Sequence, residues 1–289
     1  MNRHAPARSP RFGEREAVAL FRARLGSAKP GVRLGIGDDA ALLVAPRAPL
    51  VLTVDACVEG THFLRSLIEL RDVGYKAFQA AASDLAAMGA RPLAALSALE
   101  LPRGFSKREL DSLARGQAEA ARELACPVVG GNVARAARLS ITTTVIGEAR
   151  RPLTRAGARA GDELWLVGEL GLAALGLRLL RSRRAPPARF RRERDVAVRA
   201  WRRPQALLSR GLGLVGRAHA AIDVSDGLAG DVLHLAEASG VRAVLYAALL
   251  ERALSSELRA LASFAGRTPL ELALAGGEDY ALVAAGPPP

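Results

Sequence analysis

Short acidic clusters, each beside glycine or at the end of an apolar run, are the part of this sequence best suited to chemistry. They stand at residues 35–39, 53–55, 83–85, 223–227 and 276–280. If several of these carboxylates converge, each pair of charges about 4 Å apart repels by about 4 kcal/mol at an effective dielectric near 20. Bound cations or protonation relieve such repulsion. Because Mg²⁺ prefers hard oxygen ligands that it shares with phosphates, the clusters predict a magnesium-phosphate site.

The composition is that of a folded protein with a sizeable core. Half of the 289 residues are hydrophobic, and the formal net charge of +12 comes almost entirely from arginine. The arginines are spread along the chain with few aromatic residues to stack on bases, so we expect no nucleic-acid binding. The densest run, 181–194, contains Pro186 and Pro187 and is predicted to be a solvated loop. An anion or nucleic-acid contact is the alternative for that run.

The cysteines and the apolar runs bear on location. Cys57 and Cys126 show neither metal-ligand spacing nor a disulfide framework, which is typical of a reducing cytoplasm. No apolar stretch is long enough to span a bilayer. Residues 1–12 lack the apolar middle of a signal peptide and are interpreted as a loose tail. We therefore expect a cytoplasmic protein without membrane contact.

Apolar spacing predicts the elements that position the first three clusters. Helical spacing covers 14–25, 73–88 and 107–124. The apolar run 50–54 predicts a buried strand that ends on Asp55, and the alternation over 139–146 predicts a half-buried strand. Asp84 would then lie near the end of its helix, where the helix dipole disfavours a negative charge. A nearby cation would offset this cost.

The second half of the chain repeats strands and helices around the remaining clusters. A strand is predicted at 163–167, a helix at 173–180, and a short helix after Pro204. The acidic turn 223–227 would precede a helix that Gly240 closes. Further strands are predicted at 241–246 and 280–285. The break in pattern between 147 and 161 predicts a domain boundary there.

Each cluster also has a purely structural interpretation. Ser225 or Asp226 could cap the following helix, a role worth about 1 kcal/mol, and on residue type alone capping is favoured over metal binding. Asp38 and Asp39 could be turn residues. His62 is equally compatible with a packed core histidine. Residue types alone leave these alternatives open.

The order of the short motifs is a more specific signal than any one of them. From about residue 13 to the end, the series closely resembles the thiamine-monophosphate kinase family. The matching residues are Gly35-Ile36-Gly37-Asp38-Asp39, Asp55 with Glu59-Gly60-Thr61-His62-Phe63, Gly74-Tyr75-Lys76-Ala77 with Ser83-Asp84-Leu85-Ala86-Ala87-Met88-Gly89-Ala90, Gly130-Gly131, Thr154-Arg155, Ile222-Asp223-Val224-Ser225-Asp226-Gly227-Leu228 and Gly276-Gly277-Glu278-Asp279-Tyr280.

The resemblance implies an α/β (α+β) fold similar to the aminoimidazole ribonucleotide synthetase superfamily. Residues 13–148 would form an N-terminal sheet domain that binds ATP and magnesium and makes a homodimer interface, and 149–289 would form a C-terminal α/β domain. ATP and thiamine monophosphate would meet in a cleft between the domains. The implied enzyme is a phosphotransferase that passes the γ-phosphoryl group of ATP directly to the substrate phosphate, giving thiamine diphosphate and ADP. Several Mg²⁺ ions would assist, and no covalent or acid–base catalytic residue is assigned.

The resemblance also implies roles for individual residues. His62 and Glu278 would bind thiamine monophosphate, and Asp84 would be shared between several magnesium ions. The implied ATP contacts are Gly131, Asn132, Arg155 and Ser225. The implied metal ligands are Asp38, Thr53, Val54, Asp55, Asp84, Asn132, Asp223 and Asp226.

Several features of this chain depart from the family pattern. The usual Gly-Gly-Asp-Thr-Thr is here Gly-Gly-Asn-Val-Ala at 130–134, so a charged magnesium ligand becomes the neutral amide of Asn132. Val54 stands where a hydroxyl residue is usual, which leaves its backbone carbonyl as the ligand, and Ala173 stands where a serine is common. The chain also ends a few dozen residues before the family normally does, which predicts an incomplete C-terminal domain. These departures predict impaired activity.

Two classes of alternative remain open. A catalytically weak or inactive nucleotide-binding or regulatory protein would keep the fold without turnover. Another ATP-dependent enzyme of the superfamily, such as aminoimidazole ribonucleotide synthetase, is compatible with the fold, although the 276–280 motif argues against it. Selenophosphate synthetase would need a reactive cysteine or selenocysteine in 1–12, and a hydrogenase-maturation carbamoyl dehydratase would need a C-terminal cysteine tail; this sequence has neither.

Overall fold

A computed structural model describes residues 13–26, 30–182 and 185–288, so the predicted tail at 1–12 lies outside the described residues. The described chain forms two compact units, each built from several segments. The first unit draws on Met1–Ala45, Val54–Ala77 and Ala94–Thr144, and the second on Pro46–Thr53, Phe78–Leu93 and Val145–Pro289. Three strands, β3, β4 and β6, and the helix α2 contribute to both units, and the boundary between residues 148 and 149 stays a prediction.

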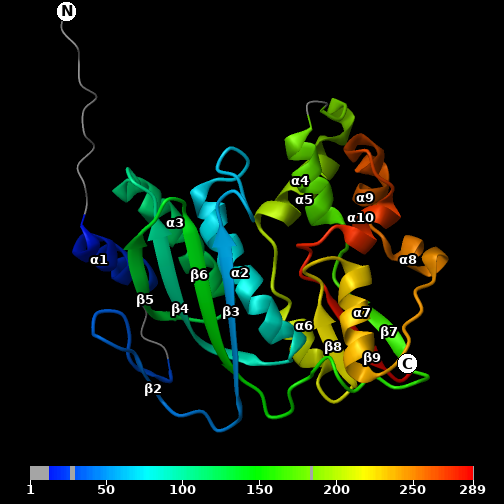
Figure 1. Cartoon of the computed structure of the whole chain (residues 1–289), viewed down its shortest axis with the longest axis horizontal. Helices are drawn as coiled ribbons and strands as arrows, with labels where there is room; N and C mark the ends of the chain where they lie inside the picture. Colours follow the sequence, from blue (N-terminus) through cyan, green and yellow to red (C-terminus); the bar gives the residue numbers. More distant parts are fainter. Residues whose placement is uncertain (1–12, 27–29, 183–184, 289) are drawn as a thin grey trace, which may run out of the picture. The chain divides into compact units, whose positions relative to one another are not determined.

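The N-terminal part of the chain contains a four-stranded sheet of order β3-β6-β4-β5, with β3 at one edge (Figure 1). Strands β4 and β5 run parallel. Helix α1 packs on α3 and on β5. The core residues Leu99, Leu110, Leu113 and Ile141 are almost fully buried. The elements of this part are α1 (Glu14–Leu25), β1 (Val32–Leu34), β2 (Leu42–Leu43), β3 (Leu50–Val58), α2 (Leu70–Ala87), β4 (Arg91–Leu101), α3 (Lys107–Glu123), β5 (Val128–Arg135) and β6 (Ser140–Glu148).

The C-terminal part contains a three-stranded antiparallel sheet of order β7-β9-β8. Helix α7 lies along β8, and α4 packs along α5 (Figure 1). Leu175, Ile222, Leu235 and Val283 lie in the core of this part. Its elements are β7 (Glu163–Val167), α4 (Leu172–Arg181), the 3-10 helix η1 (Ala188–Phe190), α5 (Arg191–Arg202), α6 (Leu208–Leu214), β8 (Ala220–Asp223), α7 (Leu228–Ser239), α8 (Ala247–Ala253), α9 (Ser256–Leu261), the 3-10 helix η2 (Ala262–Ala265), α10 (Pro269–Ala275) and β9 (Leu282–Gly286).

Most predicted elements are confirmed, and four predictions are wrong. The run 50–54 forms a strand but is not buried, since Leu50, Leu52 and Val54 are 49, 62 and 63 % exposed. The predicted helix at 14–25 and the strand at 163–167 have the same bounds in the structure. The predicted strand at 241–246 is not a strand. The arginine-rich run 181–194 is predicted to be a loop, but its residues 188–190 form η1 and its residues 191–194 belong to α5. Asp55 does not end its strand, because β3 continues to Val58. The acidic turn before α7 and the helix end at Gly240 are confirmed.

Candidate active site

Asp223 is a buried carboxylate at the end of β8, directly before the turn that leads into α7. It is 6 % exposed and accepts a hydrogen bond of 2.7 Å from the Ser83 hydroxyl. Burial raises the pKa of Asp223 to about 6, the charges of Asp84 and Asp231 raise it further, and the Ser83 hydrogen bond opposes the rise. The structure therefore brings Asp223 and Asp84 close enough to repel each other. A cation or a proton is needed to relieve this repulsion.

Asp84 lies in the last turn of α2 and is tied to the β3 strand. The Thr53 hydroxyl donates a hydrogen bond of 2.5 Å to the Asp84 carboxylate. Alternation along β3 places Thr53 and Asp55 on one face, whereas Val54 is on the other face and 63 % exposed. Two predicted ligands thus share a face, while the side chain of Val54 points away from it. For Val54 only the backbone carbonyl remains a candidate ligand.

Asp231, which sequence reasoning did not select, holds the turn that carries Ser225 and Asp226. One of its carboxylate oxygens accepts hydrogen bonds from the backbone N–H groups of Ser225, Asp226 and Gly227, each at 3.1 Å. Asp231 is 3 % exposed, and burial raises its pKa. These N–H groups at the start of α7 are therefore occupied by a carboxylate of the chain itself. Ser225 and Asp226 are left to act through their side chains.

A second loop, residues 276–280, is joined to this turn by backbone hydrogen bonds. The N–H of Glu278 donates to the Ser225 carbonyl at 2.7 Å, and the N–H of Tyr280 donates to the Val224 carbonyl at 2.9 Å. Both donors have left-handed backbones, with φ of 59° and 51°. Gly277 also has a positive φ, and a Cβ there would lie 2.7 Å from the Ser225 carbonyl. The backbone strain is held in place by the neighbouring loop, as is common at functional sites.

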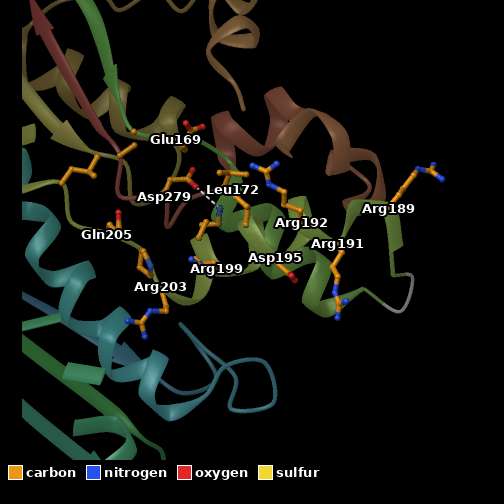
Figure 2. A pocket seen from close by; sticks show the side chains of 17 residues that line it. Glu169, Leu172, Arg189, Arg191, Arg192, Asp195, Arg199, Arg203, Gln205 and Asp279 are labelled. Atoms are coloured by element: carbon orange, nitrogen blue, oxygen red, sulfur yellow. Dashed lines mark hydrogen bonds between the residues drawn. The ribbon is translucent and has the colours of Figure 1, made fainter. Parts of the chain in front are cut away.

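The side chains of Asp279 and Trp201 fix the 276–280 loop. The sequence alone did not indicate either of these contacts. The Asp279 carboxylate accepts hydrogen bonds from the N–H groups of Gly171 and Ala173 at 2.6 and 3.1 Å. Figure 2 shows this carboxylate beside the start of α4. Burial raises the pKa of Asp279 to about 7, which the two N–H donors oppose. Trp201 donates its indole N–H to the Glu278 carboxylate at 2.8 Å.

The pocket next to Asp279 has a volume of about 920 Å³ and is lined by arginines of η1 and α5. Figure 2 shows Arg189, Arg191 and Arg203 pointing in different directions. They do not converge on one point, as a dedicated anion site would require. The arginines of α5 are therefore mainly the polar face of an amphipathic helix, whose opposite face buries Ala197, Val198 and Trp201.

The predicted ATP contacts of the first unit lie in the middle of β5, where the strand is exposed. Gly131 has φ of 154°, and a Cβ there would lie 1.8 Å from the backbone carbonyl of Ser97 on β4. Only glycine fits this close approach between strands. Asn132 is exposed and pairs with Ala98 in the parallel ladder. Its amide therefore belongs to the edge strand of the sheet, and the motif at 130–134 contains no carboxylate.

Asp38 and His62, also in the first unit, lie in exposed turns. The Asp38 carboxylate accepts the Asp39 N–H at 2.8 Å, as the turn interpretation predicts. The ring nitrogen Nδ1 of His62 accepts the Val58 N–H at 3.0 Å, so the neutral ring carries its proton on Nε2. His62 is exposed, which contradicts the alternative of a packed core histidine.

Arg155, in the second unit, has an exposed side chain and a fixed backbone. The Ser239 hydroxyl donates to the Arg155 carbonyl at 2.8 Å, and it accepts the N–H groups of Gly157 and Ala158. The carbonyl of Thr154 accepts the Ala221 N–H at 3.0 Å. The strand that ends on Asp223 and the segment that carries Arg155 are thus tied together.

The oxygen donors of Asp84, Asp223 and Thr53 fit magnesium only if ligands from outside the chain complete the coordination shell. In the described part of the chain, no three His, Cys, Asp or Glu side chains lie close enough together to hold a metal ion. The carboxylates of Asp84 and Asp223 and the Thr53 hydroxyl are nonetheless hard oxygen donors, and burial, with the charges of Asp84 and Asp231, raises the pKa of Asp223. Magnesium usually takes one or two carboxylates and completes its shell with phosphate and water. The residues present are compatible with that pattern.

The sequence also matches two families that together cover most of the chain. Residues 37–149 match AIR synthase related protein, N-terminal domain, and residues 159–288 match AIR synthase related protein, C-terminal domain. The fold and the acidic loops thus define an AIR synthase-related protein with both domains. No helix in the described ranges is long and apolar enough to cross a membrane.

Closer relatives define the particular family. The thiamine-monophosphate kinase of Aquifex aeolicus is 36 % identical over 86 % of this chain and 79 % of its own length, and that of Escherichia coli K12 is 36 % identical over 93 % and 81 %. The crystal structure of thiamine-monophosphate kinase from Stenotrophomonas maltophilia K279a has a TM-score of 0.82 at 35 % identity, over 96 % of this chain and 86 % of the other. A structure of AaThiL complexed with AMPPCP and TMP has a TM-score of 0.77 at 34 % identity, over 96 % and 87 %. The chain belongs to the thiamine-monophosphate kinase family.

Proposed function

We propose that this protein transfers the γ-phosphoryl group of ATP to thiamine monophosphate, giving thiamine diphosphate and ADP. The observation that carries the proposal is the junction of two loops within one unit. The turn that bears Asp223, Ser225 and Asp226 is joined by backbone hydrogen bonds to the loop that bears Glu278. Relatives at 33–38 % identity are thiamine-monophosphate kinases, and one similar structure holds an ATP analogue together with TMP.

We assign the charged groups to binding and positioning. Asp38, Thr53, Asp55, Asp84, Asp223 and Asp226, with the backbone carbonyl of Val54 and the amide of Asn132, would hold several magnesium ions. Magnesium supplies charge neutralisation of the phosphate oxygens when it is bound. Gly131, Arg155 and Ser225 would contact ATP, and His62 and Glu278 would hold thiamine monophosphate.

The residues of this chain need only hold the γ-phosphate of ATP and the phosphate of thiamine monophosphate in line for transfer. The Arg155 guanidinium is a permanent planar cation suited to phosphate oxygens. The Val58 N–H keeps the His62 proton on Nε2, which makes that nitrogen a donor toward a ligand. No side chain is assigned to form a covalent intermediate, because phosphoryl transfer depends on positioning and electrostatics.

The test is a turnover assay with purified protein, ATP, thiamine monophosphate and millimolar magnesium chloride, with thiamine diphosphate separated by chromatography. We expect product that depends on all three additions and disappears with a chelator. Calorimetric titration of each ligand accompanies the assay. If both ligands bind and no product forms, the enzyme proposal fails, and an inactive nucleotide-binding member of the family becomes the better account.

We also propose a homodimer that forms through the N-terminal sheet. The edge strand β3 exposes Leu50, Leu52 and Val54 on one face, at 49, 62 and 63 %. An apolar face on an edge strand favours association with another chain. Light scattering after size exclusion should give twice the chain mass for the wild type, and the chain mass for Leu52→Glu.

Location and domain limits complete the proposal. Cys57 and Cys126 are both buried and form no disulfide, which suits a reducing cytoplasm. We take 13–148 and 149–289 as the two domains, and we expect no nucleic-acid partner. Salt-dependent DNA binding stronger than that of a typical basic protein would contradict the last point.

A further inference from the structure

Trp201 lies in the last turn of α5 with its side chain almost completely buried. Its exposed fraction is 1 %, and its indole N–H donates a hydrogen bond of 2.8 Å to the Oε2 atom of Glu278. A buried indole N–H needs an acceptor, since leaving it unpaired carries a desolvation penalty. The bond therefore has a strong reason to persist in the free protein.

Glu278 is fixed at its backbone as well as at its carboxylate. Its N–H donates to the Ser225 carbonyl at 2.7 Å, and its φ of 59° is held by the neighbouring loop. The following residue, Asp279, is tied to the start of α4. With the main chain held, the side-chain torsions are the remaining freedom of Glu278. The bond to Trp201 restricts those torsions.

We propose that Trp201 is a positioning residue for the substrate carboxylate Glu278. The inference rests on the proposed function, in which Glu278 binds the thiamine portion of the substrate, a molecule with a cationic thiazolium ring and an aminopyrimidine. A carboxylate held in one place binds such a ligand without the entropy cost of ordering it. Trp201 is buried and acts on the substrate only through Glu278.

The chain offers a matched control because it has two tryptophans, Trp165 and Trp201. Trp165 lies on β7, where its ring packs against Gly286 of β9, and we assign it no role in the site. Trp201→Phe removes the N–H donor and keeps an aromatic ring, and Trp165→Phe makes the same change elsewhere in the same unit. Comparing the two separates the loss of a donor at Glu278 from the general cost of the substitution.

We expect Trp201→Phe to raise the KM for thiamine monophosphate about ten- to hundredfold, since hydrogen bonds to charged groups are worth that range. The KM for ATP should change by less than about twofold. Trp165→Phe should leave both constants unchanged. In an E278Q background, Trp201→Phe should add little further effect, because the two residues act as one unit.

Binding can be followed without turnover by fluorescence. In Trp165→Phe the only indole is that of Trp201, so titration with thiamine monophosphate should change the emission. In Trp201→Phe, where only Trp165 remains, the same titration should leave the emission unchanged. Thermal melting of each variant shows whether it is folded.

The outcomes separate the two proposals. An unchanged or lower KM for thiamine monophosphate in folded Trp201→Phe overturns the positioning role, as do equal rises in both KM values or additive effects with E278Q. Should Trp201→Phe not fold, a silent Trp201 signal in Trp165→Phe on ligand binding overturns it. If Trp165→Phe shows a Trp201 signal on binding thiamine monophosphate but the wild type forms no product, the proposed function fails and the positioning role stands. Absence of binding by the wild type overturns both.

Discussion

The turn at 223–227 and the middle of strand β5 at 130–132 are both predicted to meet magnesium and ATP, and they are built in opposite ways. In the turn, three backbone N–H groups are bonded to Asp231, and Asp223 is buried against Ser83. In β5, Gly131 and Asn132 are exposed and belong to a parallel ladder with β4. One region is a charged, preorganised half-site, and the other contributes only neutral groups.

The difference shows where the chain concentrates its electrostatic cost. Burial, with repulsion from Asp84 and Asp231, raises the pKa of Asp223 to about 6, so the free protein holds this carboxylate at the expense of stability. Asn132 carries no charge and no such cost. If the charge of Asp223 serves to bind magnesium, removing that charge should lower activity and raise stability. A substitution at Asn132 should have only a small effect on either.

The largest effect is expected for Asp223→Asn. The amide keeps an acceptor for the Ser83 hydroxyl and removes the charge that repels Asp84, so the melting temperature in magnesium-free buffer at pH 8 should rise. Turnover should fall by more than about 100-fold, because a charged phosphate-site ligand is lost. Thermal melting with a chelator and the turnover assay test both parts.

Asp162→Asn in the same unit is the matched control for Asp223→Asn. Asp162 accepts a hydrogen bond of 3.0 Å from His219, and its pKa is lowered by that hydrogen bond and charge against the opposing effect of burial. Its replacement should therefore lower the melting temperature and leave turnover unchanged. A fall in melting temperature for Asp223→Asn, similar to that of Asp162→Asn, would contradict the idea that Asp223 is held at a cost.

The preorganisation of the turn is tested by Asp231. Asp231→Ala leaves the N–H groups of Ser225, Asp226 and Gly227 without their acceptor, which should lower the free energy of unfolding by about 3 kcal/mol. Asp231→Asn keeps an acceptor oxygen and should lose only about 1 kcal/mol. Urea denaturation measures both. Equal losses for the two variants would show that the acceptor geometry is not what stabilises the turn.

The sequence could predict the two acidic loops because their signals are local. Glycine beside aspartate, followed by an apolar helical pattern, is sufficient to place 223–227 before α7 and to end that helix at Gly240. The partners of these loops come from distant segments and have no local signal: Ser83 is 140 residues from Asp223, and Trp201 is 77 residues from Glu278. Asp231 alone had a local signal, since it follows the turn by one helical turn.

The wrong predictions arise where the local preference of a segment is not supported by the elements around it. The β-branched and aromatic residues of 241–246 favour a strand, yet the segment is irregular in the structure, with Val244 and Tyr246 at 52 and 66 % exposed. The three strands β7, β9 and β8 do not pair with it. In α5, the charge of Arg191, Arg192 and Arg194 concealed a helical pattern that continues to the buried Ala197 and Trp201.

A smaller effect is expected from Asp279, which couples pH to the stability of the second loop. Its folded pKa of about 7 lies above the ordinary aspartate value, so the folded state keeps a proton that the unfolded chain releases. Its stabilising contribution is full below about pH 4 and is lost as pH rises through 7. Between pH 5 and 8, the wild type should lose about 5 °C more in melting temperature than Asp279→Asn.

The comparison between the two pH curves isolates Asp279 because Asp223, whose pKa is also raised, is present in both proteins. Asn at this position still offers an oxygen to the N–H of Gly171 or Ala173, so the loop should remain attached to α4. Parallel curves for the two proteins would mean that the Asp279 carboxylate is solvated in the folded state.

The smallest effect is expected in β5, where Asn132→Asp restores a charged oxygen at the family position. Ala134→Asp is the control, since residues 132 and 134 are both exposed and share a face of β5. If the amide of Asn132 is a weak ligand, Asn132→Asp should lower the magnesium concentration for half-maximal turnover about threefold, and Ala134→Asp should not. An equal change in both variants would indicate a general attraction of cations by added negative charge. No change in either would mean that the charged turn at 223–227 carries the magnesium dependence without help from the strand, and the contrast between the two regions would then be functional as well as structural.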